Sequence, residues 1–217
     1  MPPSDTPTDA PAHGTLPEAA PARKRPKQGE RRAQILQALA AMLEQPGAER
    51  ITTAALAARL AVSEAALYRH FASKAQMFEA LIDFIETTLF GLINQITERD
   101  PAGSAQAARI VAMVLQFGEK NPGMTRVMVG DALVFENERL QQRMNLLFDK
   151  LEAALRQSLR GLPQGADPAE SATPTADAQV AASVLTAFMV GRLQRFARSG
   201  FRRAPTEVLE PALARLL

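Results

Sequence analysis

The sequence predicts an all-α protein of about nine helices, with a small N-terminal helix-turn-helix head and a larger helical body. Three observations support this prediction. Large apolar residues recur at helical spacing along most of the chain, as at Met77, Leu81 and Leu89. No segment alternates apolar and polar residues convincingly, as a half-buried strand would. Capping Ser and Thr residues begin the periodic segments, and Pro and Gly residues end them.

Composition divides the chain into three regions. Residues 1–22 are rich in Pro, Ala, Thr and Asp and hold almost no large apolar residue, so we expect a disordered tail. Residues 23–75 form the predicted head, and residues 76–217 form the predicted body. Within the body, "GLPQGADPAESATPTA" (161–176) is expected to be a loop or linker because of its Pro and Gly content.

Capping residues place each helix of the head. The first helix lies in "QGERRAQILQALAAMLEQPG" and ends at Pro46-Gly47. The next begins at Thr52 or Thr53 as N-cap, and Ala61-Val62 make a tight corner after it. The remaining boundaries are these: Ser63 caps a short helix through Phe71, Ser73 caps a long helix over 74–98, and further helices are expected over 105–120, 122–134, 136–160, 178–199 and 206–215.

Several function classes are excluded or disfavoured by composition. The 217 residues include no cysteine, which excludes disulfides and thiolate metal sites. The only histidines are His13 and His70, so no Ser-His-Asp set or metal cluster can be assembled, and neither an enzyme nor a cofactor is expected. No apolar run approaches the ~18 residues of a membrane span, and no secretory signal is present. We therefore expect a soluble, cytoplasmic protein.

Positive charge is concentrated in the head. Residues 22–75 hold ten Lys and Arg against four acids, whereas residues 76–217 hold fifteen bases and sixteen acids. A basic region on a neutral body indicates a polyanion partner for the head alone. The alternative is a solvated charged surface, and charge by itself does not decide between them.

The two short helices and the corner between them have the spacing of a helix-turn-helix that reads the major groove of DNA. Leu67 and Phe71 are expected to bury against the preceding helices, which turns Ala65 and Tyr68 outward. Small residues on that outer face allow close approach to base edges, while basic and polar tips suit phosphates. The predicted DNA-binding residues are Thr53, Ser63, Glu64, Ala65, Ala66, Tyr68, Arg69, His70 and Lys74.

The segment "TTAALAARLAVSEAALYRHFASKAQMF" resembles the DNA-binding signature of TetR-type regulators. The resemblance implies a TetR-like fold, binding to double-stranded DNA and a homodimer. One departure is Ala61, where that family commonly has glycine. If the corner requires positive φ, alanine is strained there by about 1 kcal/mol.

The body is similar to one branch of the same family, whose members act in nucleoid occlusion. "FGEKNPGMTRVMVGDALVFENERLQQRMNLLFDKLEAALRQSLR" and "QRFARSGF" carry this resemblance, which covers roughly residues 28–204. It implies association with the nucleoid and a second partner, the tubulin-like division protein FtsZ. Phe84, Lys120 and Asn121 match the groove that holds FtsZ in that branch, whereas Leu92 and Gln116 depart from its pattern.

The helices predicted over 136–160 and 178–199 are amphipathic, and pairs of such helices form four-helix dimer interfaces. The alternative is that their apolar faces close the core of one chain. Whether dimers pair further on DNA is left open. The predicted dimer residues are Leu147, Leu151, Val184, Phe188 and Phe196.

The sequence leaves two alternative functions. A ligand-responsive transcriptional repressor would need a pocket, for which the available lining is Met113, Phe117, Met124, Met128, Phe135 and Met189; at helical spacing these residues suit a core as well. A helical module whose basic region binds membrane or RNA is disfavoured, because such a surface needs no recognition-helix pattern.

Overall fold

The computed structural model describes residues 28–45, 50–160 and 174–217. Over these residues the chain is entirely helical, as the sequence predicted, with nine α-helices and one 3₁₀ helix. The predicted tail 1–22 and most of the predicted linker 161–176 lie outside the described residues.

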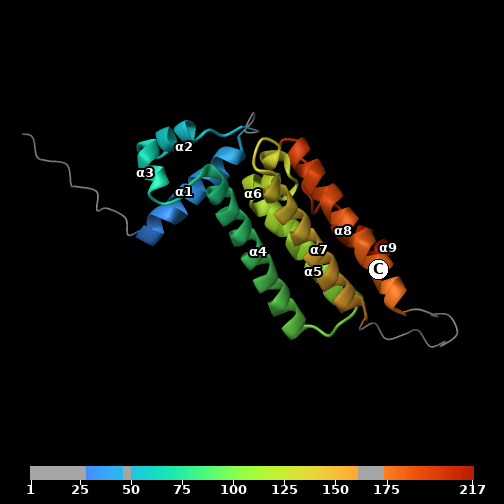
Figure 1. The fold of residues 1–217 in the computed structure, drawn as a ribbon. Helices are drawn as coiled ribbons and strands as arrows, with labels where there is room; N and C mark the ends of the chain where they lie inside the picture. Colours follow the sequence, from blue (N-terminus) through green and yellow to red (C-terminus); the bar gives the residue numbers. More distant parts are fainter. Residues whose placement is uncertain (1–27, 46–49, 161–173) are drawn as a thin grey trace, which may run out of the picture.

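The head contains the first three helices, and a long helix connects it to the body (Figure 1). The head helices are α1 (Gln28–Leu43), α2 (Thr53–Arg59) and α3 (Glu64–Tyr68), followed by the connecting helix α4 (Lys74–Arg99). The body helices are α5 (Ser104–Lys120), α6 (Pro122–Met128), η1 (Asp131–Leu133), α7 (Glu138–Arg160), α8 (Pro174–Arg198) and α9 (Leu209–Leu216).

Side-chain caps begin the helices around the turn motif. The hydroxyl of Thr52 accepts the N–H of Ala55 at 3.1 Å, so Thr52 is the N-cap of α2 and Thr53 is its first residue. Ser63 caps α3 in the same way, with a 3.3 Å bond, and Ser73 caps α4 with a 3.2 Å bond. These caps satisfy N–H groups that have no partner within the helix, as the sequence predicted.

Several predicted boundaries were wrong, including the helix starts predicted at 136 and 206, which lie at Glu138 and Leu209. The segment 122–134 is not one helix, because Gly130 adopts φ 83° and separates α6 from η1. The recognition helix ends at Tyr68 rather than Phe71. Helix α8 begins at Pro174, inside the predicted linker, with the proline at the first turn where its missing N–H costs nothing.

The head packs on the body through α1 and α6. A Cβ atom added to Gly123, in the first turn of α6, would lie 2.0 Å from the carbonyl oxygen of Ala40 on α1. Only glycine permits this approach, so α6 packs closely against the head at this point. The apolar core is continuous across this junction, from Ile35 and Leu39 in α1 to Leu193 in α8.

Helices α4 and α7 are joined along their exposed edges by ion pairs between residues about 60 positions apart in sequence. The hydrogen bond to Asp83 raises the pKa of the Arg143 guanidinium, although burial opposes it. The ion pairs are Arg139–Glu79 (2.6 Å), Arg143–Asp83 (2.6 Å), Arg143–Glu86 (3.5 Å) and Lys150–Glu86.

Among the described residues, no helix is long and apolar enough to cross a lipid bilayer.

Candidate nucleic-acid interface

Helix α3 turns one face into the head and the other outward. Leu67 and Phe71 are each 1% exposed and belong to the core, as predicted. Tyr68 is 45% exposed. Ala66 is half-buried. The remaining outward residues are exposed: Ser63, Glu64, Ala65 and Arg69. The predicted outer face of the recognition helix is therefore a real surface.

A polar network fixes α2 against α3 at this surface. The Thr53 hydroxyl donates to a Glu64 carboxylate oxygen at 2.5 Å, and the Tyr68 hydroxyl donates to Thr53 at 3.5 Å. The network orients Glu64 and Tyr68 before any ligand arrives. A preorganised carboxylate on a recognition helix can accept a hydrogen bond from the amino group of cytosine.

The corner between the two helices requires positive φ. Ala61 adopts φ 53°, a left-handed conformation that glycine tolerates and alanine does not favour. The N–H of Val62 donates to the carbonyl of Ala57 at 3.0 Å, which closes the corner and holds Ala61 in place. The strain expected at this departure from the family pattern is therefore present.

His70 is held by its backbone. The Arg32 guanidinium donates to the His70 carbonyl oxygen and lies 4.1 Å from the centroid of the Phe71 ring. Within the described residues, His70 Nδ1 is buried without a hydrogen-bond partner. Arg32 thus stabilises the turn that follows α3 through the His70 carbonyl and the Phe71 ring.

Lys74 is not a free cation in this structure. Its ammonium group forms an ion pair with Glu136, from the connection between η1 and α7, and lies 5.7 Å from the Phe78 ring centroid. The Glu136 side chain is only 10% exposed, compared with 25% for Lys74. A DNA phosphate would have to compete with this carboxylate for Lys74.

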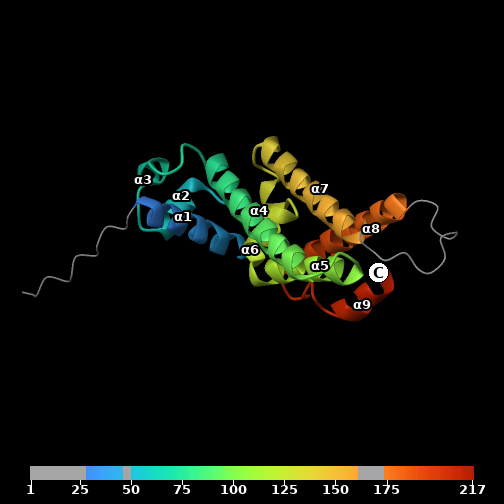
Figure 2. The same ribbon diagram turned by 90° about the horizontal axis from the view of Figure 1, so that it is seen from below.

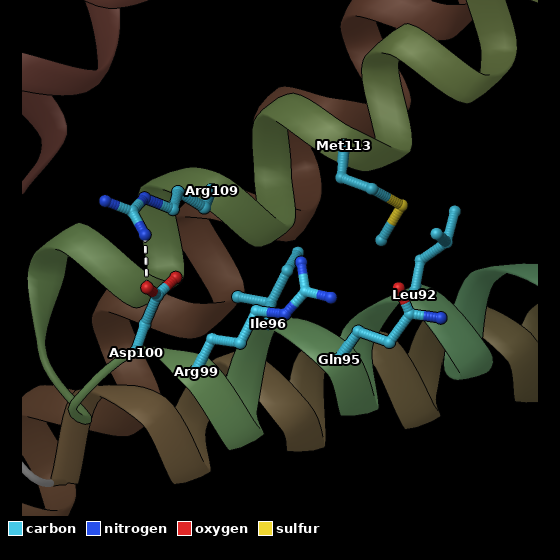
Figure 3. A pocket seen from close by; sticks show the side chains of 7 residues that line it. All are labelled: Leu92, Gln95, Ile96, Arg99, Asp100, Arg109 and Met113. Atoms are coloured by element: carbon cyan, nitrogen blue, oxygen red, sulfur yellow. Dashed lines mark hydrogen bonds and ion pairs between the residues drawn. The ribbon is translucent and has the colours of Figure 1, made fainter.

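A shallow groove runs between α4 and α5. It measures about 330 Å³ and is lined by Leu92, Gln95, Ile96, Arg99, Asp100, Arg109 and Met113. Figure 3 shows Leu92 and Met113 at one end and the Arg109–Asp100 ion pair at the other. An apolar end and a charged end are features that suit an extended peptide.

The predicted partner residues lie along the same two helices. Phe84 lies two turns before Leu92 on α4, and Lys120 lies two turns after Met113 on α5, so both are beyond the residues that line the groove. Phe84 is 49% exposed, and Lys120 is exposed. The Asn121 amide instead donates to the Phe117 carbonyl at 2.8 Å, where it ends α5.

The departing residues occupy two different grooves. Leu92 lines the α4–α5 groove, while Gln116 lines a neighbouring one between α5 and the segment that includes Thr206 and Pro211. Leucine thus makes one end of the first groove more apolar.

The predicted dimer residues divide into two groups. Leu147, Leu151 and Phe196 are at most 3% exposed and pack inside one chain, so they are not available to a second copy. Val184 is 45% exposed, and Phe188 is half-buried. Two further exposed apolar side chains on this helix pair were missed by the sequence reasoning: Leu146 on α7, at 56% exposed, and Val180 on α8, at 64%.

The residues considered for a ligand pocket are mostly core. Phe117, Met128 and Met189 are at most 8% exposed within the main cluster. Met113 and Met124 are partly buried against the same cluster. Phe135 is 67% exposed and lines no interior.

Comparison with known proteins follows the division into head and body. Residues 35–81 match the family described as "Bacterial regulatory proteins, tetR family", and residues 104–216 match "Tetracyclin repressor-like, C-terminal domain". The chain belongs to the TetR family of bacterial regulatory proteins. It is therefore a DNA-binding regulator rather than an enzyme, as the sequence predicted.

Within that family, the chain is similar to proteins named "Nucleoid occlusion factor SlmA". The relative from Alteromonas mediterranea is 50% identical over 181 residues, which cover 83% of this chain and 91% of the relative. The relative from Enterobacter sp. (strain 638) is 49% identical over 187 residues, which cover 86% and 92%.

Solved structures of TetR-type regulators share the fold. The MbdR regulator from Azoarcus sp. CIB has a TM-score of 0.68 at 16% identity, covering 88% of this chain and 97% of that one. A TetR-family transcriptional regulator from Bordetella parapertussis 12822 has a TM-score of 0.64 at 18% identity, covering 86% and 93%. These likenesses concern the fold alone.

Proposed function

We propose that this chain is a nucleoid occlusion factor. Bound as a homodimer to specific chromosomal sites in the cytoplasm, it antagonises polymerisation of FtsZ and prevents septum assembly over the nucleoid. The observation that carries the proposal is similarity to nucleoid occlusion factors at about 50% identity through both the head and the body. TetR-type bodies differ widely in sequence, so agreement through the body is the informative part.

DNA is read by the outer face of α3 in this proposal. Ala65 lies against base edges, while Arg69, Tyr68 and His70 contact phosphates or bases nearby. Lys74 exchanges its carboxylate partner for a phosphate when the head docks. The exposed α3 face and the Thr53–Glu64–Tyr68 network support this arrangement.

FtsZ binds along the α4–α5 groove in this proposal. Phe84 supplies an apolar contact, and Lys120 attracts acidic residues of the bound segment. The exposure of both side chains, and their positions on the two helices that line the groove, support this assignment.

The deciding experiment is sedimentation of FtsZ polymers with this protein, with and without DNA carrying its specific site. We expect polymer loss to be greatest with specific DNA. Phe84→Ala and Lys120→Glu should each restore sedimentation without changing DNA affinity. Arg160→Glu, at an exposed position at the end of α7, is the charge-reversal control and should keep full activity.

Two results would contradict the proposal. Full activity of both groove variants would reject the groove. No effect of the wild-type protein on FtsZ, together with release of DNA by a small metabolite, would instead identify a ligand-responsive transcriptional repressor.

A further inference from the structure

The end of α8 and the turn that follows it form a strongly basic surface. Residues 192–203 hold five arginines and no carboxylate. Four of the five are exposed and define the arginine turn: Arg195, Arg198, Arg202 and Arg203.

In the described part of the chain, the four guanidinium groups of the arginine turn have no acidic partner. Among the described residues, no carboxylate oxygen lies within 4 Å of these four guanidinium groups. By contrast, Arg139, Arg143 and Lys150 on α7 all form ion pairs with α4. The ion pairs between α4 and α7 therefore leave the positive charge of the arginine turn uncompensated.

Helix electrostatics explain only half of the cluster. Arg195 and Arg198 lie in the last turn of α8, where cations are stabilised by the helix dipole, although like charges three positions apart repel each other. Arg202 and Arg203 lie beyond the helix and gain nothing from the dipole. Their charge needs another explanation.

The backbone that presents Arg202 and Arg203 is rigid. Gly200 and Phe201 both adopt positive φ, 64° and 63°, which for phenylalanine is a strained conformation. The Ser199 hydroxyl accepts the N–H groups of Arg202 and Arg203 at 3.1 and 3.0 Å, and the Ser199 carbonyl accepts Nε of Arg202 at 2.9 Å. The guanidinium of Arg202 is thereby oriented before any ligand binds, which lowers the entropy cost of binding.

The arginine turn lies at the end of the body that carries the head. The Phe201 ring packs against Phe196 with ring centroids 5.1 Å apart, and it lies 5.2 Å from the guanidinium of Arg126 on α6. Helix α6 in turn contacts α1 of the head through Gly123. Figures 1 and 2 both show the C-terminal end of α8 next to α6, away from the far ends of α4 and α7.

We propose that the arginine turn is a second DNA-binding surface, which contacts the phosphodiester backbone without reading sequence. Planar guanidinium groups match phosphate oxygens in pairs, and four of them suit a repeating polyanion. DNA is the favoured partner over an acidic protein because the head on the same chain already holds a duplex, which raises its local concentration. The proposal rests on DNA binding by the head and adds a contact outside it.

The test is the double variant Arg202→Ala/Arg203→Ala in the full chain. Its affinity is measured against salt concentration, on a duplex with the specific site and on one of random sequence. The slope of log affinity against log salt should fall by about 1.8 per protomer on both duplexes, since each phosphate contact contributes about 0.9. Over a fourfold range of salt concentration, that slope corresponds to roughly a tenfold change in affinity.

Two controls separate charge from folding. Arg202→Lys/Arg203→Lys keeps the charge and should keep the slope, and thermal unfolding of both double variants should match the wild type. Arg215→Ala removes an exposed arginine from α9, away from the turn, and should leave the slope unchanged.

An unchanged slope in a folded Arg202→Ala/Arg203→Ala protein would overturn the proposal. So would loss of binding to poly-glutamate with DNA binding intact, which would assign the surface to an acidic protein. An error in the proposed DNA binding by the head would give a different result. The wild-type protein would then show no preference for the specific site, while the salt slopes of the wild type and the double variant would still differ on random DNA.

Discussion

The head and the body hold their functional residues in different ways. In the head, the outer face of α3 is held by contacts between near neighbours, as in the Thr53–Glu64 bond across eleven positions. In the body, α4 is held to α7 by pairs such as Lys150–Glu86, which are 64 positions apart. Local contacts leave a pattern in the sequence, whereas distant ones appear only after folding. The outer face of α3 can therefore be predicted from the sequence, whereas the surfaces of the body can be identified only in the structure.

The largest expected effect tests whether Leu151 on α7 belongs to the core of one chain or to the dimer interface. Leu151→Ala should lower the free energy of unfolding by about 2–5 kcal/mol, because Leu151 is fully buried and its removal leaves a cavity inside one chain. Chemical denaturation followed by circular dichroism measures this loss.

The matched variant on the outer surface is Val184→Glu. It should shift the protein from dimer to monomer in sedimentation velocity, because a charge would be buried against the partner. Its monomer should remain helical. A stable Val184→Glu dimer would contradict the α7–α8 surface as the dimer interface.

The junction between head and body gives the next effect. Gly123→Ala should cost about 1–3 kcal/mol in unfolding free energy, because the new methyl group collides with the Ala40 carbonyl on α1. It should also weaken DNA binding by loosening the head. Gly91→Ala is the control, since a Cβ there meets nothing within 4 Å and should stabilise α4 by about 0.5–1 kcal/mol. Equal effects of the two variants would mean that α1 and α6 are not in contact.

A smaller effect concerns the contact between Lys74 and the body. Lys74→Ala should weaken binding to every DNA sequence and lower the salt slope by about 0.9, the value of one phosphate contact. Glu136→Gln should strengthen binding, because a phosphate no longer competes with the carboxylate. Binding assays at several salt concentrations measure both. Weaker binding by a folded Glu136→Gln protein would mean that Glu136 positions Lys74 for DNA instead of withholding it.

Most of the fold could be predicted because helix caps and apolar spacing are local signals. Thr52, Ser63 and Ser73 begin helices as expected. The break at Gly130 was missed because the apolar residues on both sides suit a continuous helix, although glycine just after a helix is a local signal for its end. Amphipathic spacing likewise cannot distinguish a core inside one chain from an interface, which is why Leu151 was assigned to the dimer.

The candidate site was predicted in its residues but not in their partners. The outward face of α3 follows from the spacing of Leu67 and Phe71. The Glu136 partner of Lys74 and the Arg32 brace on His70 were missed, because no local pattern links residues 62 or 38 positions apart. Side-chain partners across such separations become visible only in the folded chain.

The smallest expected effect lies in the turn of the head. Ala61→Gly should raise the free energy of unfolding by up to about 1 kcal/mol, because Ala61 adopts φ 53° and glycine removes the clash of its Cβ. The greater freedom of glycine in the unfolded chain offsets part of this gain. The control is Ala58→Gly, an exposed helical position in α2, which should destabilise by about 1 kcal/mol. If thermal unfolding shows stabilisation by Ala61→Gly and destabilisation by Ala58→Gly, the backbone at position 61 is strained. Equal destabilisation would mean that the surrounding hydrogen bonds, and not the residue type, determine the energy of the corner.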